Sequence, residues 1–83
     1  MKEIVKNFNN RNIRIQVNGI IAQIFDIKDL KIYFKQDMII ITDDNIEKLK
    51  INSCWIANFY TNKDNTIMRY EFDQTGAVEL YII

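Results

Sequence analysis

Residues 54–83 read CWIANFYTNKDNTIMRYEFDQTGAVELYII, and this stretch decides the fold class. Two clusters of turn-forming residues divide it into three short segments rich in aromatic and β-branched residues. Within the segments apolar and polar residues alternate, so each segment has one apolar face and one partly wet face when extended. We therefore predict three antiparallel strands, over residues 54–61, 66–72 and 77–83.

The N-terminal half carries the same signal around Asn18-Gly19. This dipeptide lies between two segments, residues 13–17 and 20–27, in which apolar and polar residues largely alternate. Asparagine and glycine adopt positive φ with little strain, and a type I′ turn requires positive φ at both of its central residues. We therefore predict a β-hairpin with a type I′ turn at this dipeptide. An ordinary loop is the alternative.

Clusters of asparagine and aspartate separate the other short segments of the chain. The whole chain has no proline and two glycines. The side chains of asparagine and aspartate bond the nearby backbone and tolerate positive φ, so they favour turns. The sequence therefore predicts one all-β domain over residues 1–83, a small antiparallel barrel or a meander or sandwich of about six to eight short strands. Residues 2–8 fit a short helix or the start of a strand. Residues 45–49 fit a helical turn or, as we favour, mostly strand.

Length and composition limit the class of protein. The 83 residues are 48% hydrophobic and 27% charged, as expected of one folded domain. Eleven basic and eleven acidic residues give zero formal net charge, which argues against a dedicated nucleic-acid binder and removes one barrier to self-association. The single cysteine, and apolar runs too short for a signal peptide or membrane span, indicate a cytoplasmic protein that does not enter a membrane. The abundance of Ile, Asn and Lys is typical of a low-GC bacterial, phage or mobile-element genome.

Few residues here could support catalysis. The chain has no histidine, which removes the commonest general base and metal ligand, and it has no glycine-rich phosphate-binding motif. Cys54 is the candidate nucleophile, and beside Trp55 we expect it to be a buried or half-buried free thiol. Asp43-Asp44-Asn45 lacks the ligand spacing of a calcium loop and predicts a solvated turn. We therefore expect no enzymatic activity, no cofactor and no metal.

Aromatic residues crowd the C-terminal third of the chain and are the main candidates for a binding surface. Tyrosine, tryptophan and arginine are enriched at protein interfaces, although core packing explains most of the aromatic residues here. The candidate interface residues are Trp55, Phe59, Tyr60, Arg69, Tyr70, Tyr81 and Ile83. The leading hypothesis is a protein-binding or regulatory module, for example a small phage or mobile-element inhibitor of a host protein. The alternative is a small-barrel nucleic-acid or nucleotide binder that uses Tyr60, Tyr70, Arg69 and nearby lysines.

The last segment of the chain is apolar on both of its predicted faces. One face carries Val78, Leu80 and Ile82, and the other carries Tyr81 and Ile83. A thin domain with one core cannot bury both faces, and an exposed apolar face marks an interface. We therefore predict a homodimer or an obligate complex, reinforced if this strand lies at a sheet edge. In the alternative, Ile4, Val5 and Phe8 cover the second face and the chain is a monomer.

The basic residues are scattered among carboxylates, which is typical of solvated faces. Interspersed charges also protect strand edges against aggregation. Only Lys28, Lys31 and Lys35 are placed to form a local patch, together with Arg14.

Overall fold

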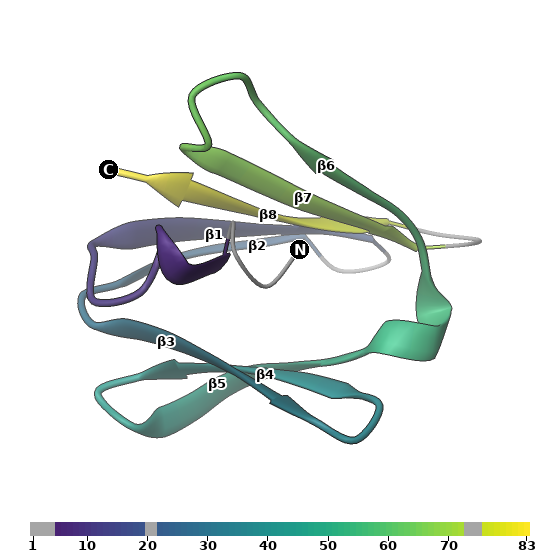
Figure 1. The fold of residues 1–83 in the computed structure, drawn as a ribbon, viewed down its shortest axis with the longest axis horizontal. Helices are drawn as coiled ribbons and strands as arrows, with labels where there is room; N and C mark the ends of the chain where they lie inside the picture. The colour runs from purple at the N-terminus through teal and green to yellow at the C-terminus, as the bar shows by residue number, and fades with distance from the viewer. Residues whose placement is uncertain (1–4, 20–21, 73–75) are drawn as a thin grey trace.

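The computed structural model describes residues 5–19, 22–72 and 76–83, which form two antiparallel sheets packed face to face (Figure 1). The larger sheet contains β1 (Ile13–Asn18), β2 (Gln23–Ile27), β6 (Ile56–Thr61), β7 (Ile67–Phe72) and β8 (Ala77–Ile82), in the spatial order β2-β1-β8-β7-β6. The smaller sheet contains β3 (Leu30–Lys35), β4 (Met38–Asp43) and β5 (Ile46–Asn52), in that order. The 3-10 helix η1 (Ser53–Trp55) leads from β5 into β6. The all-β prediction is confirmed, and the fold is a sandwich rather than a closed barrel.

The predicted segments become strands whose ends shift by at most three residues. Most of residues 45–49 lies in β5, as favoured from the sequence. Cys54 and Trp55 belong instead to η1, because the Asn52 side chain accepts a hydrogen bond from the Cys54 N–H (2.9 Å) and caps that turn. In the N-terminal segment, residues 5 and 6 have helical backbone, whereas residues 2–4 lie outside the described residues.

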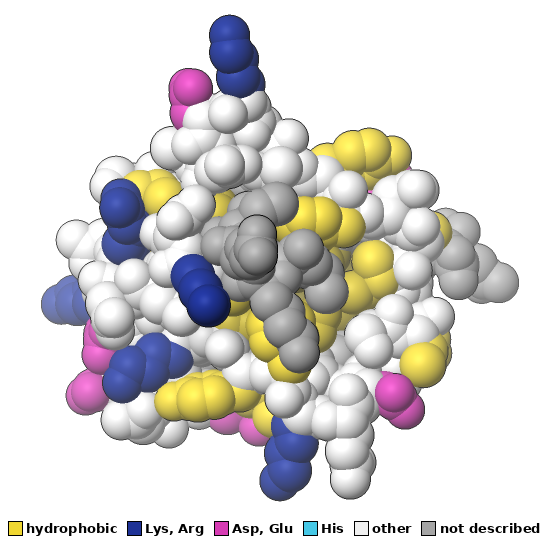
Figure 2. Space-filling view, in the orientation of Figure 1, with side chains coloured by type: hydrophobic (Ala, Val, Ile, Leu, Met, Phe, Trp, Pro, Cys, Tyr) yellow, Lys and Arg dark blue, Asp and Glu magenta, His cyan; other side chains and the backbone are white. Residues whose placement is uncertain are grey.

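The core lies between the two sheets. Strand alternation sends every second side chain into this space. Ile15, Tyr70 and Leu80 enter it from the larger sheet, and Ile39 and Ile41 enter it from the smaller one; each is at most 1% exposed. Figure 2 shows hydrophobic side chains in the middle of the molecule, where the two sheets face each other. These residues belong to one contiguous hydrophobic cluster.

The N-terminal segment packs into the core rather than over the outside of the larger sheet. Val5 and Phe8 are 2% and 0% exposed and belong to the cluster between the sheets. The Asn10 N–H donates to the Leu30 carbonyl (2.8 Å), which ties the segment to the edge strand β3. The expected alternative, in which this segment covers the second face of the last strand, is therefore wrong for Val5 and Phe8. Ile4 lies outside the described residues.

The last strand, β8, occupies the middle of the larger sheet. It pairs with β1 on one side and with β7 on the other, so that Leu80 lies opposite both Ile15 and Met68. Its backbone groups are therefore used within the sheet. Self-association through an unpaired edge of this strand, one route considered from the sequence, does not apply.

The β1–β2 hairpin is confirmed, but its turn is not the predicted type I′ turn at Asn18-Gly19. Val17 pairs with Gln23, so residues 18–22 connect the strands, and Gly19 does not have a positive φ. Residues 20–21 lie outside the described residues. Pairing with β8 extends β1 through Asn18, which holds that residue in strand conformation.

A two-residue turn with the predicted backbone conformation occurs in the smaller sheet. Asp44 and Asn45 both have positive φ, 51° and 65°, and they connect the paired residues Asp43 and Ile46. This is the backbone requirement of a type I′ turn. The prediction of a solvated turn at Asp43-Asp44-Asn45 is consistent with this geometry.

Candidate functional site

The candidate site is the outer face of the five-stranded sheet, the side turned away from the core. Cross-strand pairing places one row of residues across all five strands of this face. From edge to edge the row is Ile24, Gln16, Glu79, Arg69 and Tyr60. Tyr81 lies on the same face, two residues along β8 from Glu79, and pairs with Arg14 and Ile67. The register therefore brings together three of the predicted interface residues, Tyr60, Arg69 and Tyr81.

A hydrogen-bonded network crosses the centre of this face. Arg69 donates through Nε to Glu71 Oε2 (3.1 Å), and its Nη1 lies 3.2 Å from Glu79 Oε2. Asn18 Nδ2 donates to the other oxygen of Glu79 (3.5 Å), and Gln16 Nε2 donates to Asn18 Oδ1 (3.2 Å). The bond to Glu71, together with that to Glu79, raises the pKa of the Arg69 guanidinium. The network therefore spans β1, β8 and β7, and it holds the long, charged side chain of Arg69 in one orientation.

A second ion pair joins the two strands at one side of the face. Arg14 Nε donates to Asp26 Oδ1 (2.9 Å) and Arg14 Nη2 donates to Asp26 Oδ2 (3.3 Å), which is the fork geometry of a bidentate pair. The hydrogen bond from Arg14 lowers the pKa of the Asp26 carboxyl. Because both side chains are about half exposed, the pair adds little stability and mainly orders the surface.

The tyrosine next to this network is half-buried on the outer face. Partial burial, and then its hydrogen bond to Glu79, raises the pKa of Tyr81.

Across the outer face the paired strands carry two guanidinium groups, Arg14 and Arg69, and three carboxylates, Asp26, Glu71 and Glu79. The formal net charge of the face is therefore −1.

Two predicted interface residues contribute to the core instead. The rings of Phe59 and Tyr70 contact each other with centroids 5.1 Å apart, and Tyr70 is 0% exposed. Burial raises the pKa of Tyr70 to about 12. Tyr70 therefore offers no surface for a base or a protein partner in this structure.

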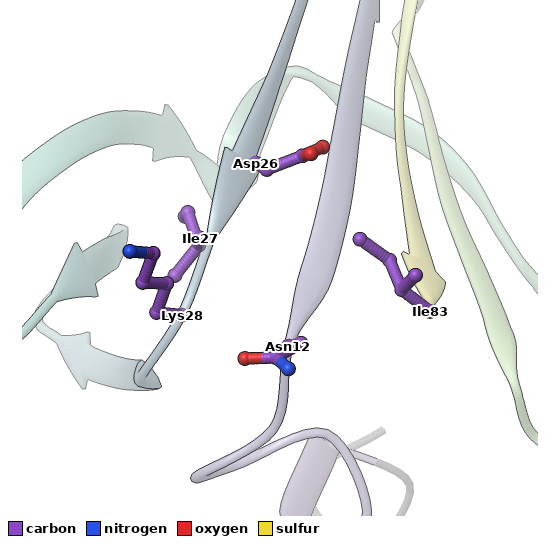
Figure 3. A pocket seen from close by; sticks show the side chains of 5 residues that line it. All are labelled: Asn12, Asp26, Ile27, Lys28 and Ile83. Carbon is purple, nitrogen blue, oxygen red and sulfur yellow. The ribbon is translucent and has the colours of Figure 1, made fainter.

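Two more predicted residues are exposed but stand apart from the network. Trp55 is 65% exposed on η1, and Ile83 is equally exposed directly after β8. Ile83 lines a shallow open hollow of about 270 Å³ together with Asn12, Asp26, Ile27 and Lys28. Figure 3 shows that Asp26 and Ile83 approach this hollow from the two strands that flank β1.

The expectation for Cys54 is wrong in one respect, because the structure exposes this residue. The sequence placed it at the start of a strand with an inward face, whereas the capped turn of η1 carries it outside the sandwich. Within residues 5–19, 22–72 and 76–83, no group of three Cys, Asp or Glu residues is arranged to hold a metal ion. The same residues contain no helix long and apolar enough to cross a membrane.

Sequence reasoning missed Ile24, Gln16 and Glu79 as members of this surface. Alternation along each segment places them on the polar side, but only the strand order shows that they share a row with Arg69. Ile24 is the exception that the sequence could have flagged, since it is an apolar residue on the polar side of its strand and is 66% exposed.

Comparison of the chain with protein-family models, with curated proteins and with solved structures found no match in any of the three.

Proposed function

We propose that this chain is a non-enzymatic protein-binding module that uses the outer face of the five-stranded sheet. The observation that carries the proposal is the row in which Arg69, fixed between Glu71 and Glu79, lies next to the exposed Tyr60. Tyrosine and arginine dominate the energetics of protein interfaces, and an arginine that is already ordered loses less freedom on binding. The charged groups of this face pair with one another, which supports binding rather than catalysis.

The occupant we propose is a second copy of the chain. Because β8 is the middle strand, a two-fold axis along β8 would lay β2 of one copy over β6 of the other. Ile24, 66% exposed on one edge, would then cover Tyr60, 49% exposed on the other edge, and the same contact would occur twice. The polar residues between these two positions would meet in the middle of the interface. Such an interface covers the two most exposed large apolar side chains of the face.

A regulatory role in the cytoplasm, such as inhibition of a host protein by a phage or mobile-element product, remains part of the proposal. It rests on small size, neutral charge and codon-related composition. The nucleic-acid alternative finds less support on this face. Tyr70 is buried, Arg69 already pairs with two carboxylates, and the net charge of −1 disfavours phosphate.

Light scattering during size-exclusion chromatography tests the proposed dimer. At about 100 µM, well above a micromolar dissociation constant, the chain should elute with twice its mass of 9.9 kDa. Ile24→Lys and Tyr60→Lys should each shift the mass toward the monomer, because either change places an ammonium group in the apolar contact. The matched control is Ile46→Lys, which introduces the same charge at an apolar residue of similar exposure (61%) in the smaller sheet. A monomeric mass for the unaltered chain would contradict the dimer.

A further inference from the structure

The outer face of the three-stranded sheet has a different character from the face proposed above. Pairing places three rows of side chains across β3, β4 and β5 on the side turned away from the core. The rows are Lys31, Thr42 and Glu47; Tyr33, Ile40 and Lys50; and Lys35, Met38 and Asn52. We call this surface the basic face. Along β3, Lys31 and Lys35 lie two residues before and after Tyr33.

The basic face is positively charged although the whole chain is neutral. Its paired residues carry three ammonium groups and one carboxylate, a formal net charge of +2, not counting Lys48, an exposed lysine of β5 that the register shift leaves out of the rows. The carboxylate of Glu47 lies 3.5 Å from Lys50 Nζ, and both side chains are about half exposed. Among the residues that the structure describes, neither Lys31 nor Lys35 forms an ion pair within 4.0 Å. Two lysines therefore remain available to an anionic partner.

An aromatic ring lies between these lysines. Tyr33 is 46% exposed, and its hydroxyl donates to Asn45 Oδ1 (3.5 Å) in the turn between β4 and β5. Side chains two residues apart on a strand lie roughly 7 Å from each other. A base stacked on Tyr33 would therefore place its flanking phosphates within reach of the flexible chains of Lys31 and Lys35.

We propose that the basic face binds single-stranded nucleic acid, with Tyr33 as the stacking residue and Lys31, Lys35 and Lys50 as phosphate contacts. An acidic peptide is the competing partner. It is favoured less, because the cations of this face are all lysines, whereas bidentate capture of carboxylates is characteristic of arginine. This site lies on the opposite side of the sandwich from the proposed dimer contact. The failure of one proposal would therefore leave the other unaffected.

Fluorescence anisotropy with a labelled oligothymidylate of about twelve nucleotides, within the site size of single-strand binders, tests the proposal. Saturable binding is expected at low salt. Three phosphate contacts to a single strand predict a slope of about −2 in the logarithm of affinity against that of salt. Raising the salt fourfold should therefore weaken binding by about tenfold or more.

Two pairs of variants distinguish the contribution of this site to binding affinity from the effects of net charge and of misfolding. Lys35→Glu should weaken binding at least tenfold, whereas Lys63→Glu, with the same change of net charge in the exposed β6–β7 loop, should change it less than about twofold. Tyr33→Leu should weaken binding about tenfold, while Tyr33→Phe, which also lacks the hydroxyl but keeps the ring, should bind normally. Thermal unfolding of each variant confirms that it is folded.

Three results would overturn the proposal. The first is the absence of saturable binding at low salt. The second is an equal loss in the two members of either pair, which would mean that net charge or structure, and not this site, governs affinity. The third is competition by polyglutamate as effective as that by unlabelled oligothymidylate, which would show that the face recognises negative charge alone and would favour the acidic peptide.

Discussion

Tyr70 places a polar hydroxyl group inside the hydrophobic core. Its side chain is fully buried, and among the described residues its hydroxyl has no hydrogen-bond partner. An unsatisfied buried polar group costs about 1–3 kcal/mol. The ring itself packs well, since it lies against Phe59 in the core. The residue therefore contributes to the fold through its ring and opposes it through its hydroxyl.

Tyr70→Phe should raise the free energy of unfolding by about 1 kcal/mol at neutral pH, because the ring stays and the unsatisfied hydroxyl leaves.

The unaltered chain should also lose stability in alkali. The pKa of Tyr70 is about 12 in the folded state against 10 when unfolded, so this contribution is intact below pH 10 and is lost as pH rises from 10 to 12. The loss is about 2–3 kcal/mol. Urea titrations at several pH values measure both effects, and an equal alkaline loss in Tyr70→Phe would contradict the argument.

The elements show where sequence patterns suffice and where they do not. Alternation located the strands in both halves of the chain because the inward side is fixed by burial, as in β7, where Met68 and Tyr70 point inward. The turn at Asn18-Gly19 was misassigned because its conformation depends on a long-range neighbour, β8, and not on the dipeptide alone. The exposure of Cys54 likewise depends on a local cap that alternation does not reveal.

The contact between β1 and the residue before β8 gives a test at this scale. Gly76 has a φ of 91°, and a Cβ atom added there would lie 2.0 Å from the Asn18 carbonyl oxygen. Gly76→Ala should therefore destabilise the protein by about 2–3 kcal/mol, from backbone strain and the clash together. Gly19→Ala is the matched control, because a Cβ there meets nothing within 4 Å, and its effect should stay within about 0.5 kcal/mol. Thermal or urea unfolding measures both, and equal effects would contradict this description of the β1–β8 junction.

At the scale of the whole molecule, the fold separates charges that the sequence intersperses. The outer face of the larger sheet has a formal charge of −1 and the basic face has +2, while the chain as a whole has none. The expected patch of Lys28, Lys31, Lys35 and Arg14 is divided accordingly. Arg14 belongs to the outer face of the larger sheet, and Lys31 and Lys35 belong to the basic face. This division could not be predicted, because it depends on which strands share a sheet.

The two sheets are also joined by a segment that belongs to neither of them. Phe8 lies outside every strand, yet it is 0% exposed and packs into the core that both sheets share. The segment that carries it is tied to β3 by the hydrogen bond from Asn10 to Leu30. The N-terminal segment is therefore part of the core and does not lie on its surface.

Phe8→Ala should accordingly lower the free energy of unfolding by about 3–5 kcal/mol, the usual cost of removing a buried phenylalanine ring. A domain of this length has a total stability of roughly 4–12 kcal/mol, so the variant should lose a large share of it. Lys6→Ala, in the same segment but exposed, should change stability by no more than about 0.5 kcal/mol. Urea unfolding followed by far-ultraviolet circular dichroism measures the strands and not the segment itself. If Phe8→Ala left that transition unmoved, the segment would not contribute to the core that holds the two sheets together.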